Sequence, residues 1–100
     1  MVKHIILWNL KDELSDEEKT KIKIEAKTNL ENLVGQIPGL IDLNIQTTYY
    51  ESSNVDLMLD STFESIDALK QYSIHPKHVE MAAKYVRPYT SKRSCIDYEI

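Results

Sequence analysis

The chain has 100 residues, a net charge of −4 at pH 7 and a hydrophobic fraction of 42%. This length predicts one domain, residues 1–100, with a single thin core. Its basic residues are dispersed among acidic ones, which argues against nucleic acid as a partner. The one cysteine, Cys95, excludes an internal disulfide and fits a cytoplasmic protein. No run approaches the ~20 apolar residues of a membrane span, so no membrane partner is expected.

The N-terminal segment Val2–Leu10 has two apolar-leaning faces, which predicts a strand covered on both sides. The face that should meet this chain's own helices carries apolar residues and one histidine: Val2, His4, Ile6, Trp8 and Leu10. Ile5 and Leu7 lie on the opposite face, which we expect a second subunit to cover.

The first helix is the clearest element in the chain. Ser15 and Glu18 form the capping-box pattern that opens a helix, with acidic residues in the first turn. Apolar residues then recur near the helical period: Ile22, Ala26, Leu30, Leu33, Val34 and Ile37. Gly35 is the expected C-cap, and Pro38-Gly39 would close the connection to the next strand.

Two alternating segments follow, and each predicts a half-buried strand. In residues 40–48 the apolar positions are Ile41, Leu43, Ile45 and Thr47. In residues 55–61 they are Val55, Leu57 and Leu59. Residues 49–54 suit the hairpin loop between the two strands.

The C-terminal part of the chain predicts two helices separated by a proline. Thr62 or Ser65 would cap the first of these helices, which Pro76 ends. Proline suits the first position of a helix and disfavours the α conformation in the residue before it, so His75 should be the N-cap of the next helix. That second helix should continue to about Val86.

Residues 94–100 alternate once more and predict a last strand. The order β-α-β-β-α-α-β is a ferredoxin-like α+β arrangement: a four-stranded antiparallel sheet with its helices on one face. The other face would carry Ile5, Leu7 and Met58 into water. Pairing of two sheets face to face would cover these residues, so we expect a homodimer formed through the sheet face.

Hydrogen-bonding side chains gather at the junction of the two C-terminal helices: Tyr72, His75 and His78. His78 would lie near the positive end of a helix dipole, which favours a neutral imidazole. A neutral imidazole can take a proton from a carbon next to a carbonyl. The Tyr72 hydroxyl could orient that imidazole or donate to a developing enolate oxygen. His4, on the strand face assigned to the helices, would meet both in an apolar cavity.

Each of these residues also has a structural alternative. Tyr72 and His78 would form a hydrogen bond that only fixes the helix junction, His4 would be a satisfied core histidine, and His75 a capping residue. His75 and His78 could share a metal face, but no third ligand accompanies them, so no metal site is predicted. Cys95 has no histidine near it in the sequence, which makes a thiol nucleophile a weak candidate. The two glycines form no phosphate-binding loop, and no cofactor is expected.

Four segments resemble the stress-responsive A/B barrel (Dabb) family: VKHIILWNLKD, DELS, TFES and YSIHPKHVEMAAKYVRPY. The resemblance covers essentially the whole chain, and its most specific part is H-P-x-H with a tyrosine three residues before it. It implies a dimeric α/β barrel, in which two ferredoxin-like sheets face each other with the helices outside. Most members of this family have no assigned activity.

A polyketide cyclase that resembles this chain more distantly closes a linear polyketide by aldol condensation, with a tyrosine and a histidine of the same motif and a further histidine on the first strand. The matching catalytic candidates here are Tyr72, His78 and His4. Leu57 stands where that cyclase has another pocket histidine, so the resemblance does not extend to its substrate. It implies a cofactor-free cyclase or isomerase that acts on a carbonyl compound with His78 as base. The alternative is a non-catalytic dimer that binds a small apolar ligand or has a structural role.

Overall fold

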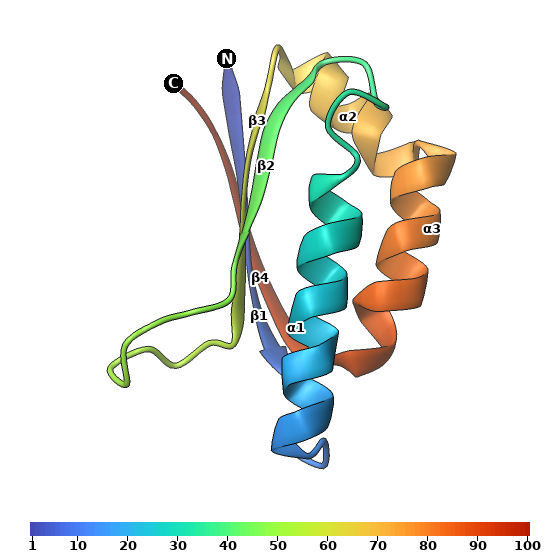
Figure 1. The fold of residues 1–100 in the computed structure, drawn as a ribbon. Coiled ribbons are helices and arrows are strands. Elements are labelled where there is room, and N and C mark those ends of the chain that lie inside the picture. The colour runs from blue at the N-terminus through green and yellow to red at the C-terminus, as the bar shows by residue number, and fades with distance from the viewer.

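The computed structural model describes residues 1–100 and contains one four-stranded antiparallel sheet, three α-helices and a short 3₁₀ helix (Figure 1). In chain order the elements are β1 (Val2–Leu10), α1 (Asp16–Glu31), β2 (Leu40–Gln46), β3 (Leu57–Phe63), α2 (Ile66–Ile74), α3 (Pro76–Tyr85), η1 (Arg87–Tyr89) and β4 (Thr90–Glu99). The strand order is β2-β3-β1-β4. The predicted ferredoxin-like α+β fold is therefore confirmed.

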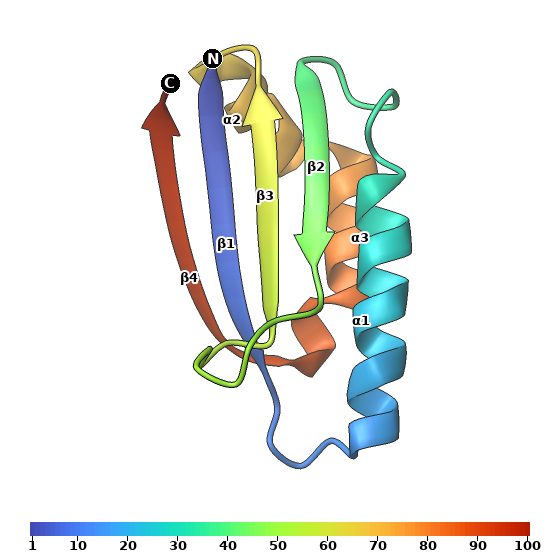
Figure 2. The ribbon, with the colours of Figure 1, turned by 60° about the vertical axis from the view of Figure 1, so that its left-hand side comes forward.

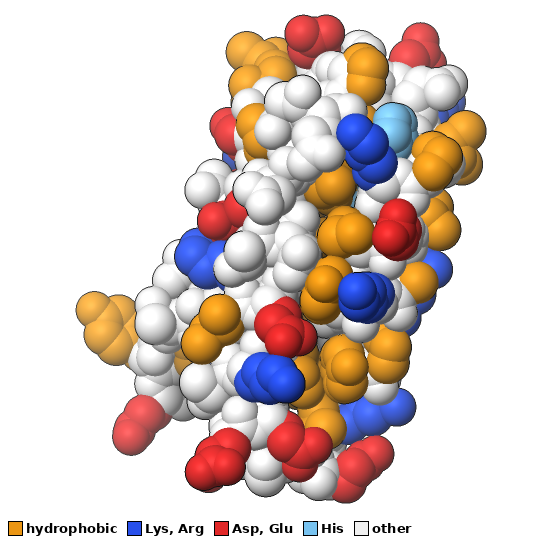
Figure 3. Space-filling model, turned by 45° about the vertical axis from the view of Figure 1, so that its right-hand side comes forward, with side chains coloured by type: hydrophobic (Ala, Val, Ile, Leu, Met, Phe, Trp, Pro, Cys, Tyr) orange, Lys and Arg blue, Asp and Glu red, His pale blue; other side chains and the backbone are white.

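The helices cover one face of the sheet and leave the other bare (Figure 1). Viewed onto the sheet, β4 and β2 form its two edges, and α2 lies behind β1 and β3 (Figure 2). β4 begins at Thr90, earlier than the predicted start at residue 94, and nearly all of its residues are exposed. On the helix-covered side, basic and acidic side chains are interspersed with hydrophobic ones (Figure 3). No helix is both long enough and apolar enough to cross a membrane.

The central strand β1 has the two faces that its sequence predicted. Every second residue from Val2 to Leu10 is buried against the helices, and His4 is among them with 7% of its surface exposed. The residues between them are half-buried on the bare face. The alternation of β1 thus places His4 beneath the helices, as expected.

Helix α1 begins as predicted and ends earlier than predicted. The backbone N–H of Glu18 donates to the Ser15 hydroxyl, and the Glu18 carboxylate accepts from the Ser15 N–H, both at 3.1 Å. The helix ends at Glu31 with Asn32 as its C-cap, so the C-cap expected at Gly35 was wrong. The turns after Asn32 still bury the apolar positions of residues 33 and 37, which explains why the apolar spacing continues beyond the helix.

Strand β2 contains an irregularity that the alternation did not show. The pairing with β3 shifts between Leu40 and Asp42, so that Leu40, Leu43 and Ile45 are buried. Ile41 is 41% exposed, and its predicted place among the buried residues was wrong. An extra residue in one strand of a pair reverses the faces of the residues before it. The connection from β2 to β3 spans residues 47–56, which is longer than predicted.

The junction of α2 and α3 follows the local signals in the sequence. Ser65 caps α2 by accepting a hydrogen bond from the Ala68 N–H, whereas Thr62 belongs to β3. Pro76 is the first residue of α3, and His75 is its N-cap in an extended conformation. The chain therefore turns sharply between the two helices and brings their facing side chains together.

Candidate functional site

Two of the predicted site residues stack at the helix junction. Tyr72 lies in the last turn of α2, and His78 lies in the first turn of α3. Their ring centroids are 4.0 Å apart, with an angle of 30° between the ring planes. The contact is between ring faces and not a hydrogen bond, and the buried Nδ1 of His78 has no hydrogen-bond partner.

The sheet supplies the other two rings of an aromatic group around Tyr72. The ring centroid of Phe63 lies 4.9 Å from that of Tyr72, and the centroid of His4 lies 6.3 Å from it, both in an edge-to-face arrangement. Tyr72 is only 1% exposed. The structure thus brings together all three predicted residues: His4, Tyr72 and His78.

The strand at the sheet edge adds two polar side chains, Cys95 and Asp97, that were not expected beside His4 from the sequence. Asp97 in β4 is the direct cross-strand partner of His4, and its Oδ1 lies 2.5 Å from the His4 Nδ1. The Sγ of Cys95 lies 3.7 Å from the same nitrogen. The only indication in the sequence was that Cys95 and Asp97, two residues apart, lie on the same face of the last strand. Their place beside His4 depends on the pairing of β1 with β4.

Burial sets the charge of the stacked pair. It lowers the pKa of His78 below its ordinary value of 6.5, and the nearby Arg87 and His4 lower it further, while the backbone at Ser73 opposes the change. The predicted neutral imidazole is supported in direction, and burial is the main cause of the lowered pKa. Burial also raises the pKa of the Tyr72 hydroxyl, which stays protonated as a donor.

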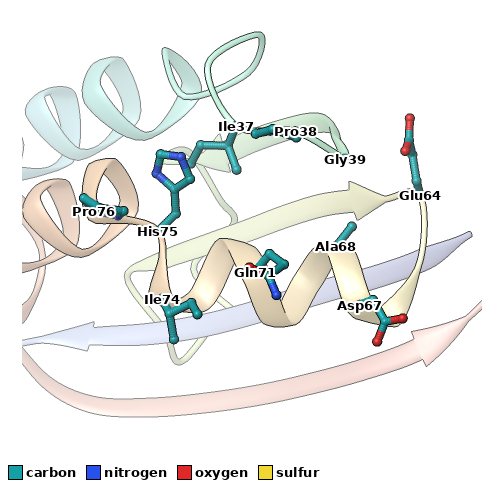
Figure 4. A pocket seen from close by; sticks show the side chains of 10 residues that line it. All are labelled: Ile37, Pro38, Gly39, Glu64, Asp67, Ala68, Gln71, Ile74, His75 and Pro76. Atoms are coloured by element: carbon teal, nitrogen blue, oxygen red, sulfur yellow. The ribbon is translucent and has the colours of Figure 1, made fainter.

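The expected apolar cavity is not one of the main clefts of this structure, and the rings of Phe63, Tyr72 and His78 pack against one another where it was expected. None of the five main clefts is lined by His4, Tyr72 or His78. A cleft of about 520 Å³ lies elsewhere, between α2 and the turn at residues 37–39 (Figure 4). His75 lines this cleft, and its Nδ1 accepts a hydrogen bond from the Lys77 N–H at 3.2 Å. This is the capping role proposed for His75.

The sequence is similar to known proteins along its whole length. The family model described as the stress responsive A/B barrel domain matches residues 2–100. The chain is 32% identical over 100 residues to olivetolic acid cyclase of Cannabis sativa, an alignment that covers 97% of this chain and 94% of that protein. It is 33% identical over 101 residues to the stress-response A/B barrel domain-containing protein HS1 of Arabidopsis thaliana, covering 98% and 88% of the two chains.

The fold also matches solved structures. A dimeric protein of unknown function from Bacteroides fragilis, described as having a ferredoxin-like fold, superimposes with a TM-score of 0.92 and 30% identity. The match covers 99% of this chain and 95% of that one. From the family model and these similarities, we conclude that the chain belongs to the stress-responsive A/B barrel domain family.

Proposed function

We propose that this protein is a homodimer that catalyses cofactor-free proton transfer on a carbonyl compound, with His78 as the general base. The observation that carries the proposal is the buried, unpartnered Nδ1 of His78 beside the Tyr72 ring. A buried polar atom without a partner costs about 1–3 kcal/mol, so it calls for an explanation. An imidazole kept neutral to accept a substrate proton is such an explanation.

The roles of the three residues follow from their places. His78 takes a proton from the carbon next to the substrate carbonyl, since burial keeps its imidazole neutral at pH 7. The Tyr72 hydroxyl donates to the enolate oxygen that forms. His4, held by Asp97, positions the carbonyl group from the sheet side. The similarity to olivetolic acid cyclase supports a reaction of this class.

The substrate should be apolar beyond its carbonyl group. Leu57 is buried on the sheet face that carries His4, and Phe63 also lies on this face. None of the five main clefts reaches the ring stack, so we propose that a ligand enters as α3 moves away from the sheet. These apolar side chains suit a cyclase or isomerase that acts on a polyketide-like carbonyl compound.

Deuterium uptake is a direct test of this chemistry. We would incubate the protein in D₂O with a panel of β-keto thioesters that carry alkyl chains of different length, and measure exchange at the carbon between the carbonyls by mass spectrometry. His78→Gln should lower the rate by about 10²–10⁴-fold, the usual contribution of a general base. Tyr72→Phe should also lower it, and His75→Gln is the control. Equal exchange by the native protein and His78→Gln would overturn the proposal.

The proposed dimer forms through the bare face of the sheet. This face carries the half-buried Ile5, Leu7 and Met58, and beside them Ile96 and Tyr98 are 59% and 45% exposed. Apolar side chains gathered on one exposed surface favour a protein interface. The Bacteroides fragilis protein, which superimposes on this chain, is itself described as dimeric. A second copy of this chain is therefore the proposed partner.

The second proposal is a non-catalytic dimer that binds a small apolar ligand or has a structural role. The closed ring stack favours it, because Tyr72 and His78 fill the space that a substrate would need. The two proposals differ in what His78→Gln changes. A structural role predicts a loss of stability and no catalysed exchange in either protein.

A further inference from the structure

Three side chains with metal-binding atoms meet on the helix-side face of the sheet, where β1 pairs with β4. They are His4, Cys95 and Asp97, and their ligand atoms lie within 4.8 Å of one another. Neither the family resemblance nor the proposed reaction assigns Cys95 a role. We propose that these residues bind a divalent transition-metal ion of the zinc type.

The distances between the ligand atoms suit a tetrahedral ion. With metal–ligand bonds of about 2.0–2.3 Å, neighbouring ligand atoms in such a site lie about 3.3–3.6 Å apart. The Cys95 Sγ is 3.7 Å from the His4 Nδ1 and 3.6 Å from the Asp97 Oδ1. The His4 Nδ1 and the Asp97 Oδ1, at 2.5 Å, would have to separate by less than about 1 Å. A small side-chain rotation achieves this.

The chemistry of the three donors selects the class of metal. A thiolate, an imidazole and a carboxylate are all zinc ligands, and the thiolate disfavours magnesium and calcium, which prefer oxygen. Three protein ligands leave the fourth position to water, the arrangement of an open zinc site. On binding, the Cys95 thiol releases its proton to solvent, and His4 binds through Nδ1 as the tautomer that carries its proton on Nε2.

The proposed metal site has one buried ligand, His4, and two ligands that solvent can reach, Cys95 and Asp97. The His4 side chain is 9% exposed and sits in the central strand, whereas the Asp97 side chain is 40% exposed and Cys95 lies on the exposed edge strand. Asp97 also lines a hollow of about 460 Å³ between β4 and the start of α2. An ion can therefore enter from the sheet edge without any movement of the core.

The three ligands come together only in the folded protein. Asp97 lies 93 residues and Cys95 lies 91 residues from His4 in the sequence, and only the register of β1 with β4 brings them together. An ion on the His4 Nδ1 replaces the proton that bonds His4 to Asp97, so the metal-bound and metal-free proteins differ at this hydrogen bond. The proposal does not rest on the proposed reaction, because it concerns binding alone.

Metal titration of tag-free, chelator-treated, reduced protein tests the site. We expect one Zn²⁺ per chain by isothermal titration calorimetry, with micromolar or tighter affinity. Co²⁺ as a spectroscopic probe should give the near-ultraviolet charge-transfer band of a thiolate–cobalt bond. Cys95→Ser should abolish this band, and both Cys95→Ser and Asp97→Asn should weaken zinc binding at least tenfold, with folding checked by circular dichroism.

His75→Gln is the matched control, because it removes a histidine outside the cluster and should leave both signals unchanged. Loss of zinc binding in this variant would place the ion elsewhere and overturn the proposal. So would substoichiometric binding, the absence of the cobalt band in the native protein, or equal zinc affinity of the native protein and Cys95→Ser. None of these outcomes depends on whether the protein catalyses proton exchange.

Discussion

Gly39 lies so close to Ala68 that a Cβ atom at position 39 would come within 2.5 Å of the Ala68 Cβ. The turn before β2 is thereby packed directly onto α2, the helix that carries Tyr72. Gly39 also has a φ of +83°, a conformation that favours glycine over every residue with a side chain. The position of α2 over the sheet thus depends on the absence of a side chain at Gly39, in the turn that packs against Ala68.

Gly39→Ala should lower the free energy of unfolding by about 3 kcal/mol, because strain at a positive φ adds to a clash between two packed segments. Gly35→Ala is the matched control. Gly35 has a similar φ of +88°, but a Cβ there meets nothing within 4 Å, so it should cost only about 1 kcal/mol. Urea denaturation of the two variants measures the difference. Equal losses would show that close packing at Ala68 contributes nothing.

Two substitutions of Tyr72 separate the contribution of its ring to packing from the contribution of its hydroxyl to the proposed reaction. Tyr72→Phe keeps the ring that stacks on His78 and should change the free energy of unfolding by no more than about 1 kcal/mol. Tyr72→Ala empties a fully buried position and should cost about 3–5 kcal/mol. Thermal and urea unfolding measure both. A large loss of stability in Tyr72→Phe would mean that the hydroxyl has a structural role.

His78 should make the stability of the protein depend on pH. An unfolded histidine gains its proton near pH 6.5, whereas burial lowers the pKa of His78 in the folded state. Below pH 6.5 the unfolded chain therefore binds more protons than the folded one, and the free energy of unfolding falls as the pH drops through the folded pKa. This contribution to stability is fully present above pH 6.5.

The measurement compares urea unfolding at pH 7.5 and pH 5.5 in the native protein and in His78→Gln. The native protein should lose more stability on acidification than the variant, which has no titratable group at this position. Parallel pH profiles for the native protein and His78→Gln would contradict the neutral state of the half-buried His78.

The bare face of the sheet predicts the oligomeric state. The native protein should have twice the 11.6 kDa chain mass in solution at micromolar concentration. Leu7→Asp places a charge on the apolar bare face and should dissociate the dimer. Ile24→Asp, on the exposed side of α1, should leave it intact. Light scattering coupled to size-exclusion chromatography distinguishes these outcomes, and a native monomer would exclude the proposed interface.

The parts of the fold that the sequence predicted correctly are those with local causes. The capping box of Ser15 and Glu18 fixed the start of α1, and Pro76 fixed the junction and the capping role of His75. The alternation of β1 placed His4 under the helices. In each case the signal and its structural effect lie within a few residues of one another.

Several features that the sequence did not predict depend on distant parts of the chain. Ile41 is exposed because the pairing of β2 with β3 shifts by one residue, and no residue near Ile41 in the sequence predicts that shift. Asp97 and Cys95 reach His4 only through the pairing of β4 with β1. The neutral state expected for His78 had the right direction, but its main cause is burial, which depends on how α3 packs.

The exposed position of β4 has a consequence for how the protein avoids misassembly. One side of this strand hydrogen-bonds to β1, and its outer backbone groups are free to recruit a further strand from another molecule. Lys92, Arg93, Asp97 and Glu99 interrupt the strand with charges of both signs, as natural edge strands do to discourage fibril growth. Replacing these charges by apolar residues would turn the sheet border into a template for aggregation.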